Sequence, residues 1–155
     1  MLRNSLPTTN NLIQRNIIPP NVQLCAGGCG KIADIDHLFL SCDFFGHLWH
    51  GIFNWLGFIT VPPEHVSNHF LQFENLGGFH KNIRLVFNLI WLACVWVVWS
   101  EINARVFRQQ EDSLQTLLDK IKLQSYWWLK AKRINFASTY HMWWLNPLAC
   151  LGIIL

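Results

Sequence analysis

An apolar run from Leu85 to Trp99, interrupted only by Asn88, limits the folds open to this chain of 155 residues. A helix that is apolar on all sides has to be covered by other helices or by lipid. The fifteen residues of the run span about 22 Å at about 1.5 Å each, less than the roughly 30 Å of a bilayer core. The run therefore predicts a buried central helix and argues against a membrane partner. A membrane-associated helical protein that uses segment 85–99 is the alternative.

Helical periodicity accompanies this run on both sides. Apolar residues recur at spacings of three and four over 37–55 and over 114–128, which predicts one long helix and one amphipathic helix. Shorter helices are expected at 12–17 and 64–73. The sequence contains no pattern of paired strands. The predicted fold class is all-α, a small helical bundle around a Trp-rich central helix.

Composition and length indicate a single packed domain. Only 14% of the residues are charged, against roughly 25% in a typical soluble domain, which excludes an intrinsically disordered chain. The net charge of +3 is too small to indicate a polyanionic partner by itself. The five cysteines are an odd number, and the first residues lack the pattern of a secretory leader. We therefore expect an intracellular protein, nuclear or cytoplasmic, and not a secreted one.

Four possible metal ligands lie within eighteen residues near the amino end, in the pattern C-x3-C-x7-H-x4-C. They are Cys25, Cys29, His37 and Cys42. Three thiolates and one imidazole match tetrahedral Zn2+, and a closed set of four protein ligands leaves no position for a substrate. The glycines beside the first two cysteines allow the tight turns that a knuckle around an ion requires. The motif predicts a structural zinc knuckle that leads into the bundle, with the knuckle and first helices over 7–56 and a helical tail over 57–155.

The spacing leaves details of this site open. His37 and Cys42 are five residues apart, about 140° around an ideal helix, so we expect His37 at an unwound helix entry. Asp34 or Asp36 would then accept a hydrogen bond from its second ring nitrogen. Ordinary buried cysteines, or a disulfide between two of them, are the alternative to zinc.

Two other histidine pairs carry weaker patterns. His47 and His50 follow the last cysteine of the motif. They are substitute ligands if the metal binds a different set of residues than the four named above. His65 and His69 are one helical turn apart, but Val66 stands where a zinc-protease helix has Glu. We expect His65 and His69 to be surface residues.

A basic segment with aromatic residues lies late in the chain. Fourteen positions without an acidic residue contain Lys120, Lys122, Lys130, Lys132 and Arg133, and Trp127 lies between them. Cations that pair with phosphates, together with rings that stack on bases, are typical of sites for single-stranded RNA or DNA. These six residues are therefore candidate nucleic-acid ligands. The alternative is a solvated helix face whose aromatic residues belong to the core.

Short motifs in a characteristic order run through nearly the whole chain. Around the cysteines they are Leu6-Pro7-Thr8, Asn11-Leu12, His37-Leu38-Phe39, Phe45-Gly46 and Leu48-Trp49. Downstream they are Trp55-Leu56-Gly57, Ile90-Trp91, Val95 to Trp99, Asn103, Phe107, Trp128, Asn146-Pro147 and Cys150. In this order they resemble the zinc-binding domain at the C-terminal end of plant LINE-type (non-LTR) retrotransposon reverse transcriptases.

The resemblance implies an accessory domain of an enzyme that performs target-primed reverse transcription. Two positions depart from the family pattern. Ala33 stands where the family often has an acidic residue, and Ile102 stands where the family has an Arg before the Asn. The polymerase of the family binds magnesium through an aspartate pair, and its endonuclease has an acidic metal site, but this sequence has neither an Asp-Asp pair nor a carboxylate cluster. We therefore expect a detached, non-catalytic, zinc-binding remnant with accessory binding of single-stranded RNA or DNA and no small-molecule substrate.

Overall fold

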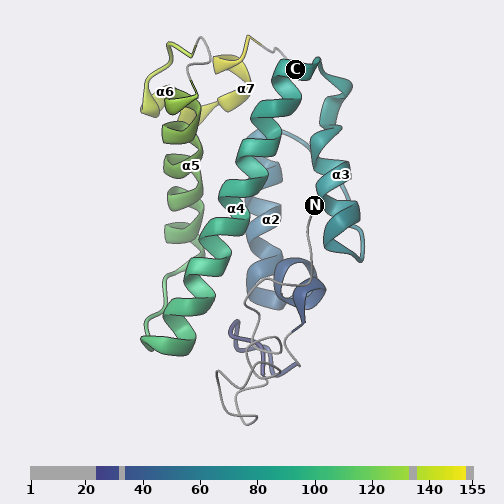
Figure 1. Ribbon diagram of the computed structural model, residues 1–155, viewed down its shortest axis with the longest axis vertical. Helices are drawn as coiled ribbons and strands as arrows, with labels where there is room; N and C mark the ends of the chain where they lie inside the picture. Colours follow the sequence, from purple (N-terminus) through teal and green to yellow (C-terminus); the bar gives the residue numbers. More distant parts are fainter. Residues whose placement is uncertain (1–23, 32–33, 133–135, 153–155) are drawn as a thin grey trace.

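A computed structural model of the protein describes residues 24–31, 34–132 and 136–152 (Figure 1). Over these ranges the chain forms helices joined by turns and loops, with no β-strand. The predicted all-α fold class is confirmed for this part of the chain. The short helix expected at 12–17 lies outside the described residues.

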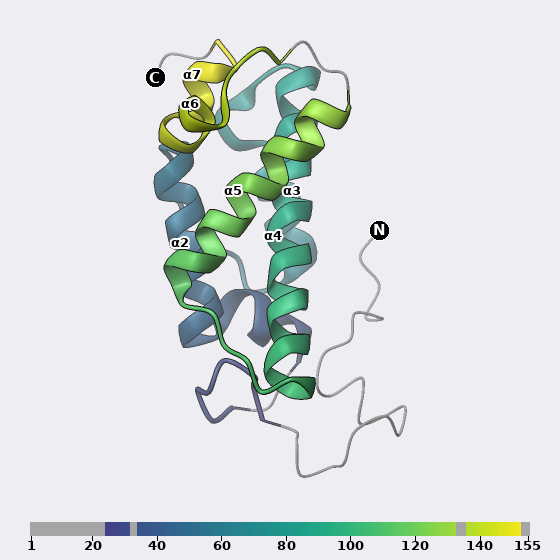
Figure 2. The same cartoon turned by 90° about the vertical axis from the view of Figure 1, so that its left-hand side faces the viewer.

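Four helices make up the body of the bundle: α2 (Asp43–Leu56), α3 (Val66–Glu74), α4 (Lys81–Phe107) and α5 (Leu114–Ala131). Helices α3 and α5 pack against α4, and α2 packs against α5 (Figures 1 and 2). Helix α2 also meets α4 where the rings of Trp49 and Trp91 stack, with their centroids 6.3 Å apart. Helix α4 thus occupies the central position that was expected for the Trp-rich helix.

Shorter elements close the two ends of the bundle. At one end lie the short helices α6 (Tyr140–Leu145) and α7 (Pro147–Cys150), and a 3-10 turn η3 (Leu76–Gly78) follows α3. At the other end lie the loop that begins at Cys25, the π-helical turn η2 (His37–Ser41) and the connection from α4 to α5 (Figures 1 and 2). The amino-terminal motif and the α4–α5 connection, distant in sequence, therefore share one end of the molecule.

Helix α4 is longer than the apolar run that predicts it. It extends over 27 residues, about 40 Å at about 1.5 Å per residue, because mixed polar and apolar residues on both sides of the run continue the helix from Lys81 to Phe107. The expectation that this helix is too short to span a membrane is therefore wrong. By length and composition α4 is the one candidate membrane span among the described residues, and more than half of its most apolar window is buried by the rest of the bundle. The core helix of a soluble bundle has the same properties.

The single helix expected over 37–55 is interrupted at Cys42. The turn η2 ends at Ser41, the backbone of Cys42 is extended at φ −63° and ψ 134°, and α2 begins at Asp43. A continuous helix would direct His37 and Cys42 to faces about 140° apart. The extended residue removes this conflict, since it lets the Cys42 side chain turn back toward Cys25.

The core is rich in aromatic side chains, and His69 lies within it. His69 is fully buried, and its ring centroid is 4.3 Å from that of Trp49. Trp91 donates a hydrogen bond from Nε1 to Nδ1 of His69 at 3.0 Å. The prediction of a surface residue is wrong for His69, because the inward face of α3 carries it, whereas His65 is exposed and pairs with Asp36.

Candidate metal centre

The four predicted ligands converge at the end of the bundle that holds η2. The ligand atoms of Cys25, Cys29, His37 and Cys42 all lie within 4.8 Å of one another. Sγ of Cys25 is 3.4 Å from Sγ of Cys42, and Sγ of Cys29 is 3.0 Å from Nε2 of His37. Sulfurs bound to one tetrahedral ion at about 2.3 Å are about 3.8 Å apart. Small shifts of the side chains, which move the close pairs apart and the more distant pairs together, would bring the four atoms to the geometry of a tetrahedral ion, and the donor set fits zinc chemically.

Backbone hydrogen bonds close the loop that carries the first two cysteines. The Cys25 amide donates to the Lys31 carbonyl at 2.8 Å, and the Gly28 amide donates to the Cys25 carbonyl at 3.0 Å. The amide of Gly27 points at Sγ of Cys25, 3.3 Å away. A Cβ atom at Gly27 would lie only 2.4 Å from Sγ of Cys42. Glycine is thus required at position 27 to let the backbone approach the sulfurs.

The imidazole of His37 is held by a neighbour that the sequence analysis missed. Its Nε2 faces the cluster, and its Nδ1 lies 3.2 Å from Oγ of Ser41. Asp34 instead accepts a hydrogen bond from the backbone amide of His37 at 2.7 Å, and Asp36 accepts one from the amide of Val66 at 2.9 Å. The expectation that an aspartate holds the second nitrogen is therefore wrong. The spacing of four residues from His37 to Ser41 was the available signal.

The cysteine pair at the centre carries an uneven charge. The hydrogen bond from Cys25 lowers the pKa of Cys42 to about 5, and the backbone amides of Phe44 and Phe45 at the start of α2 lower it as well, while burial opposes them. The same hydrogen bond, followed by burial, raises the pKa of Cys25. A helix N-terminus stabilises a thiolate in this way. Within this pair Cys42 therefore has the greater thiolate character.

Two alternatives, a disulfide and substitute ligands from His47 or His50, receive no support from the geometry, whereas burial of Cys25 and Cys42 in the core is compatible with ordinary core cysteines as well. All five cysteines are free thiols, and the 3.4 Å between the sulfurs of Cys25 and Cys42 exceeds the roughly 2.05 Å of a disulfide bond. His47 and His50 are exposed and lie outside the ligand cluster. His47 instead hydrogen-bonds the carbonyl of Asp43 through Nδ1.

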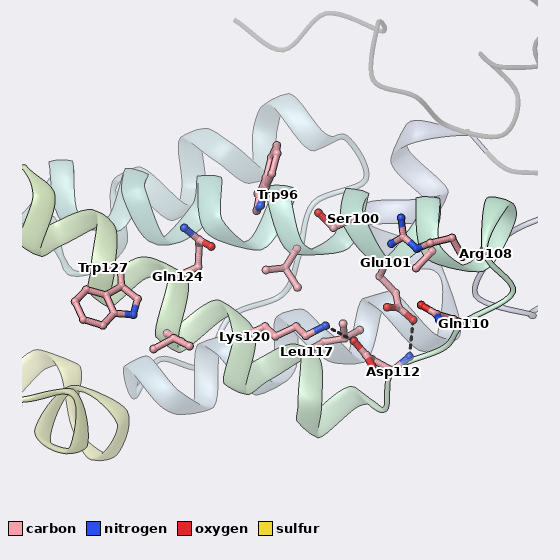
Figure 3. Close-up of a pocket in the computed structure, with 13 residues that line it drawn as sticks. Trp96, Ser100, Glu101, Arg108, Gln110, Asp112, Leu117, Lys120, Gln124 and Trp127 are labelled. Atoms are coloured by element: carbon pink, nitrogen blue, oxygen red, sulfur yellow. Dashed lines mark hydrogen bonds and ion pairs between the residues drawn. The ribbon is translucent and has the colours of Figure 1, made fainter.

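Two of the six candidate nucleic-acid residues face a cleft between α4 and α5 (Figure 3). Lys120 and Trp127 line this cleft together with Trp96, and its volume is about 360 Å³. The ring of Trp127 is 59% exposed and that of Trp96 is 47% exposed. Lys120 pairs with Asp112 on the same wall. A cation and two exposed rings therefore share one surface.

The other candidates lie elsewhere. Lys122 sits over the ring of Trp144, 4.6 Å from its centroid, and burial lowers the pKa of Lys122. Lys130 donates to the carbonyl of Phe136 at 2.9 Å, and Lys132 is exposed beyond the end of α5. Arg133 lies outside the described residues. The basic segment is thus divided among several faces of α5.

Comparisons of the chain with protein-family models, with curated proteins and with solved structures found no match in any of the three. The resemblance to the reverse-transcriptase zinc-binding domain accordingly rests on the sequence motifs.

Proposed function

We propose that this chain is a structural zinc-binding domain, in which one Zn2+ held by Cys25, Cys29, His37 and Cys42 organises the amino-terminal end of the helical bundle. The convergence of the four ligand atoms within 4.8 Å carries this proposal. Protein side chains fill all four positions of a tetrahedral ion, so none is left for a substrate. The centre stabilises the fold and performs no chemistry.

The expected energetic contribution is large. Structural zinc in small domains contributes about 10–16 kcal/mol apparent, similar to the roughly 5–15 kcal/mol of total stability of a domain. The ligands come from a loop, from η2 and from the N-cap of α2. One ion would therefore join the loop, η2 and the start of α2, in addition to the core packing that η2 and α2 already share.

The order of the motifs supports the family part of the proposal. We infer a detached accessory domain of the plant LINE-type reverse-transcriptase kind, a non-catalytic remnant that works inside the cell. Gly27 lies beside two sulfurs, where a side chain would collide with them. A zinc knuckle requires glycine at such a position.

Metal content tests the ligand assignment. Purified wild-type protein should contain one zinc per chain by elemental analysis, and Cys29→Ser should lose it because a hydroxyl is a poor zinc ligand at neutral pH. Cys150→Ser is the matched control, since Cys150 lies in α7 and outside the ligand cluster. Unchanged zinc in Cys29→Ser would overturn the assignment.

The cleft between α4 and α5 favours an accessory role in binding single-stranded nucleic acid. Lys120 supplies a cation for a phosphate, and the exposed rings of Trp96 and Trp127 offer stacking surfaces. The pair of Lys120 with Asp112 is partly exposed on both sides, so little energy opposes the exchange of Asp112 for a phosphate.

A labelled single-stranded oligonucleotide tests this role. Binding should weaken steeply with salt, and Trp127→Ala should weaken it by about fivefold to hundredfold, the equivalent of about 1–3 kcal/mol per stacked base. Trp144→Ala is the control, because Trp144 lies outside the cleft and under Lys122. The absence of binding at low salt, or equal losses in the two variants, contradicts the role.

A further inference from the structure

One arginine from the central helix reaches into the loop that carries the zinc ligands. Nη1 of Arg105 donates to the carbonyl of Ala26 at 3.0 Å, and its guanidinium lies over the ring of Phe44, 4.2 Å from the centroid. Ala26 follows the ligand Cys25, and Phe44 lies two residues after the ligand Cys42. A single side chain from α4 therefore contacts both segments that contribute the paired sulfurs.

A buried carboxylate holds this arginine in place. Nε of Arg105 donates to Oε1 of Glu101 at 2.8 Å, and the two side chains are only 8% and 3% exposed. A buried ion pair needs further hydrogen bonds to offset the loss of water. Nη1 finds one at Ala26, and Oε1 of Glu101 finds one at the backbone amide of Asp112, 2.9 Å away.

The same contacts continue to the cleft. Nη2 of Arg105 faces the carbonyl of Asp112 at 3.4 Å, one residue before the N-cap of α5. Glu101 and Asp112 both line the cleft, where Asp112 pairs with Lys120 (Figure 3). An unbroken series of hydrogen bonds and ion pairs thus leads from the metal loop to the wall of the cleft.

We propose that Arg105 is a positioning residue of the metal centre, which supports the loop from Cys25 to Cys29 from outside the ligand set and fixes the start of α5 through Glu101 and Asp112. This rests on the zinc centre proposed above. An ion bound by the loop holds the Ala26 carbonyl toward Arg105, and a loop without its ion loses that constraint. By thermodynamic linkage, if bound zinc stabilises the contacts of Arg105 by some factor, these contacts raise the affinity for zinc by that same factor.

Zinc affinity tests the first half of the proposal. In competition with a chromophoric chelator, Arg105→Met should bind zinc about 10–100-fold more weakly than wild type, the range typical of supports outside the ligand set. Arg84→Met is the matched control, since Arg84 lies on the same helix but pairs with Glu74. An Arg105→Met affinity within twofold of wild type overturns the proposal.

A second variant separates this effect from misfolding. Arg105→Met leaves Glu101 buried without its partner, and such a charge can destabilise the whole domain. The double variant Glu101→Gln/Arg105→Met removes both charges and should show the wild-type helical circular dichroism with the same loss of zinc affinity. A folded double variant with wild-type affinity contradicts the role of Arg105.

Amide exchange tests the second half. In zinc-loaded protein the amide of Asp112 should be protected, and chelation of the metal should increase its exchange rate more than tenfold and by a larger factor than that of the amide of Trp143 in α6 at the opposite end. Equal protection of Asp112 with and without zinc overturns the link to α5. A chain that binds one zinc but shows neither effect refutes the role of Arg105 alone, whereas a chain that binds no zinc refutes the zinc centre as well.

Discussion

Mild acid should destabilise this protein through a single histidine in its core. His69 is fully buried, and burial lowers its pKa from 6.5 to about 4. Because the indole of Trp91 can only donate, Nδ1 of His69 is the acceptor and the proton of the neutral ring lies on Nε2. That Nε2 is buried without a hydrogen-bond partner. The folded state thus has no place for a charged imidazole.

The sign and size of the effect follow from the two pKa values. Between pH 6.5 and pH 4 the unfolded chain binds a proton at this histidine that the folded chain does not bind. The free energy of unfolding therefore contains the full contribution above pH 6.5 and loses it as the pH falls toward 4. The complete loss is about 3 kcal/mol, of which about 2 kcal/mol occurs between pH 7 and pH 5.

The assay is urea unfolding at pH 7 and pH 5, followed by circular dichroism. His69→Gln keeps an acceptor for Trp91 but does not titrate, so its loss of stability between the two pH values should be smaller than that of wild type by about 2 kcal/mol. Protonation of the zinc ligands also destabilises the protein in acid, but it affects both proteins equally and cancels in the difference. His50→Gln, at an exposed position, should behave as wild type. If wild type and His69→Gln lose the same stability, the reasoning is wrong.

Four further substitutions probe the loop, the contact of the His37 ring and a strained turn. Gly27→Ala should weaken zinc binding at least about tenfold by chelator competition, because its Cβ would lie 2.4 Å from Sγ of Cys42. Gly28→Ala has open space at a φ of 77°, so it should cost about 1–2 kcal/mol of stability and keep the affinity; equal affinity losses contradict the steric argument. Ser41→Ala removes the partner of the ligand imidazole and should weaken zinc binding about tenfold, and an unchanged affinity would show that the ring is held by other contacts. Gln109→Gly relieves a φ of 52° after α4 and should raise the free energy of unfolding by about 1 kcal/mol in thermal melts, whereas a lower melting temperature refutes the strain.

Local periodicity accounts for most of the helices. The ranges 64–73 and 114–128 correspond to α3 and α5 within a few residues, since a spacing of three and four survives wherever a helix buries one face. The apolar run at 85–99 marks the middle of α4 but not its ends. Beyond Trp99 the helix keeps buried residues such as Ile102 and Ala104 but mixes them with polar ones, so a run that is apolar on all sides ends before the helix does, and the length of α4 was underestimated.

The cluster of Cys25, Cys29, His37 and Cys42 was predictable from the spacing of the motif, but the contacts around it were not. The extended backbone of Cys42 divides the expected helix. The spacing of apolar residues is the same before and after this break, so periodicity alone does not reveal it. Burial of His69 depends on which face of α3 meets α2 and α4, a tertiary property. Arg105 meets Ala26 across 79 positions of sequence, and no local pattern predicts a contact of that range.

X-ray absorption at the zinc edge of the purified, zinc-loaded protein reports which atoms bind the metal. We expect one zinc with three sulfur neighbours at about 2.3 Å and one nitrogen neighbour at about 2.0 Å, with no bound water. A shell dominated by oxygen or nitrogen neighbours, or a protein that does not retain zinc, would contradict the four-ligand centre.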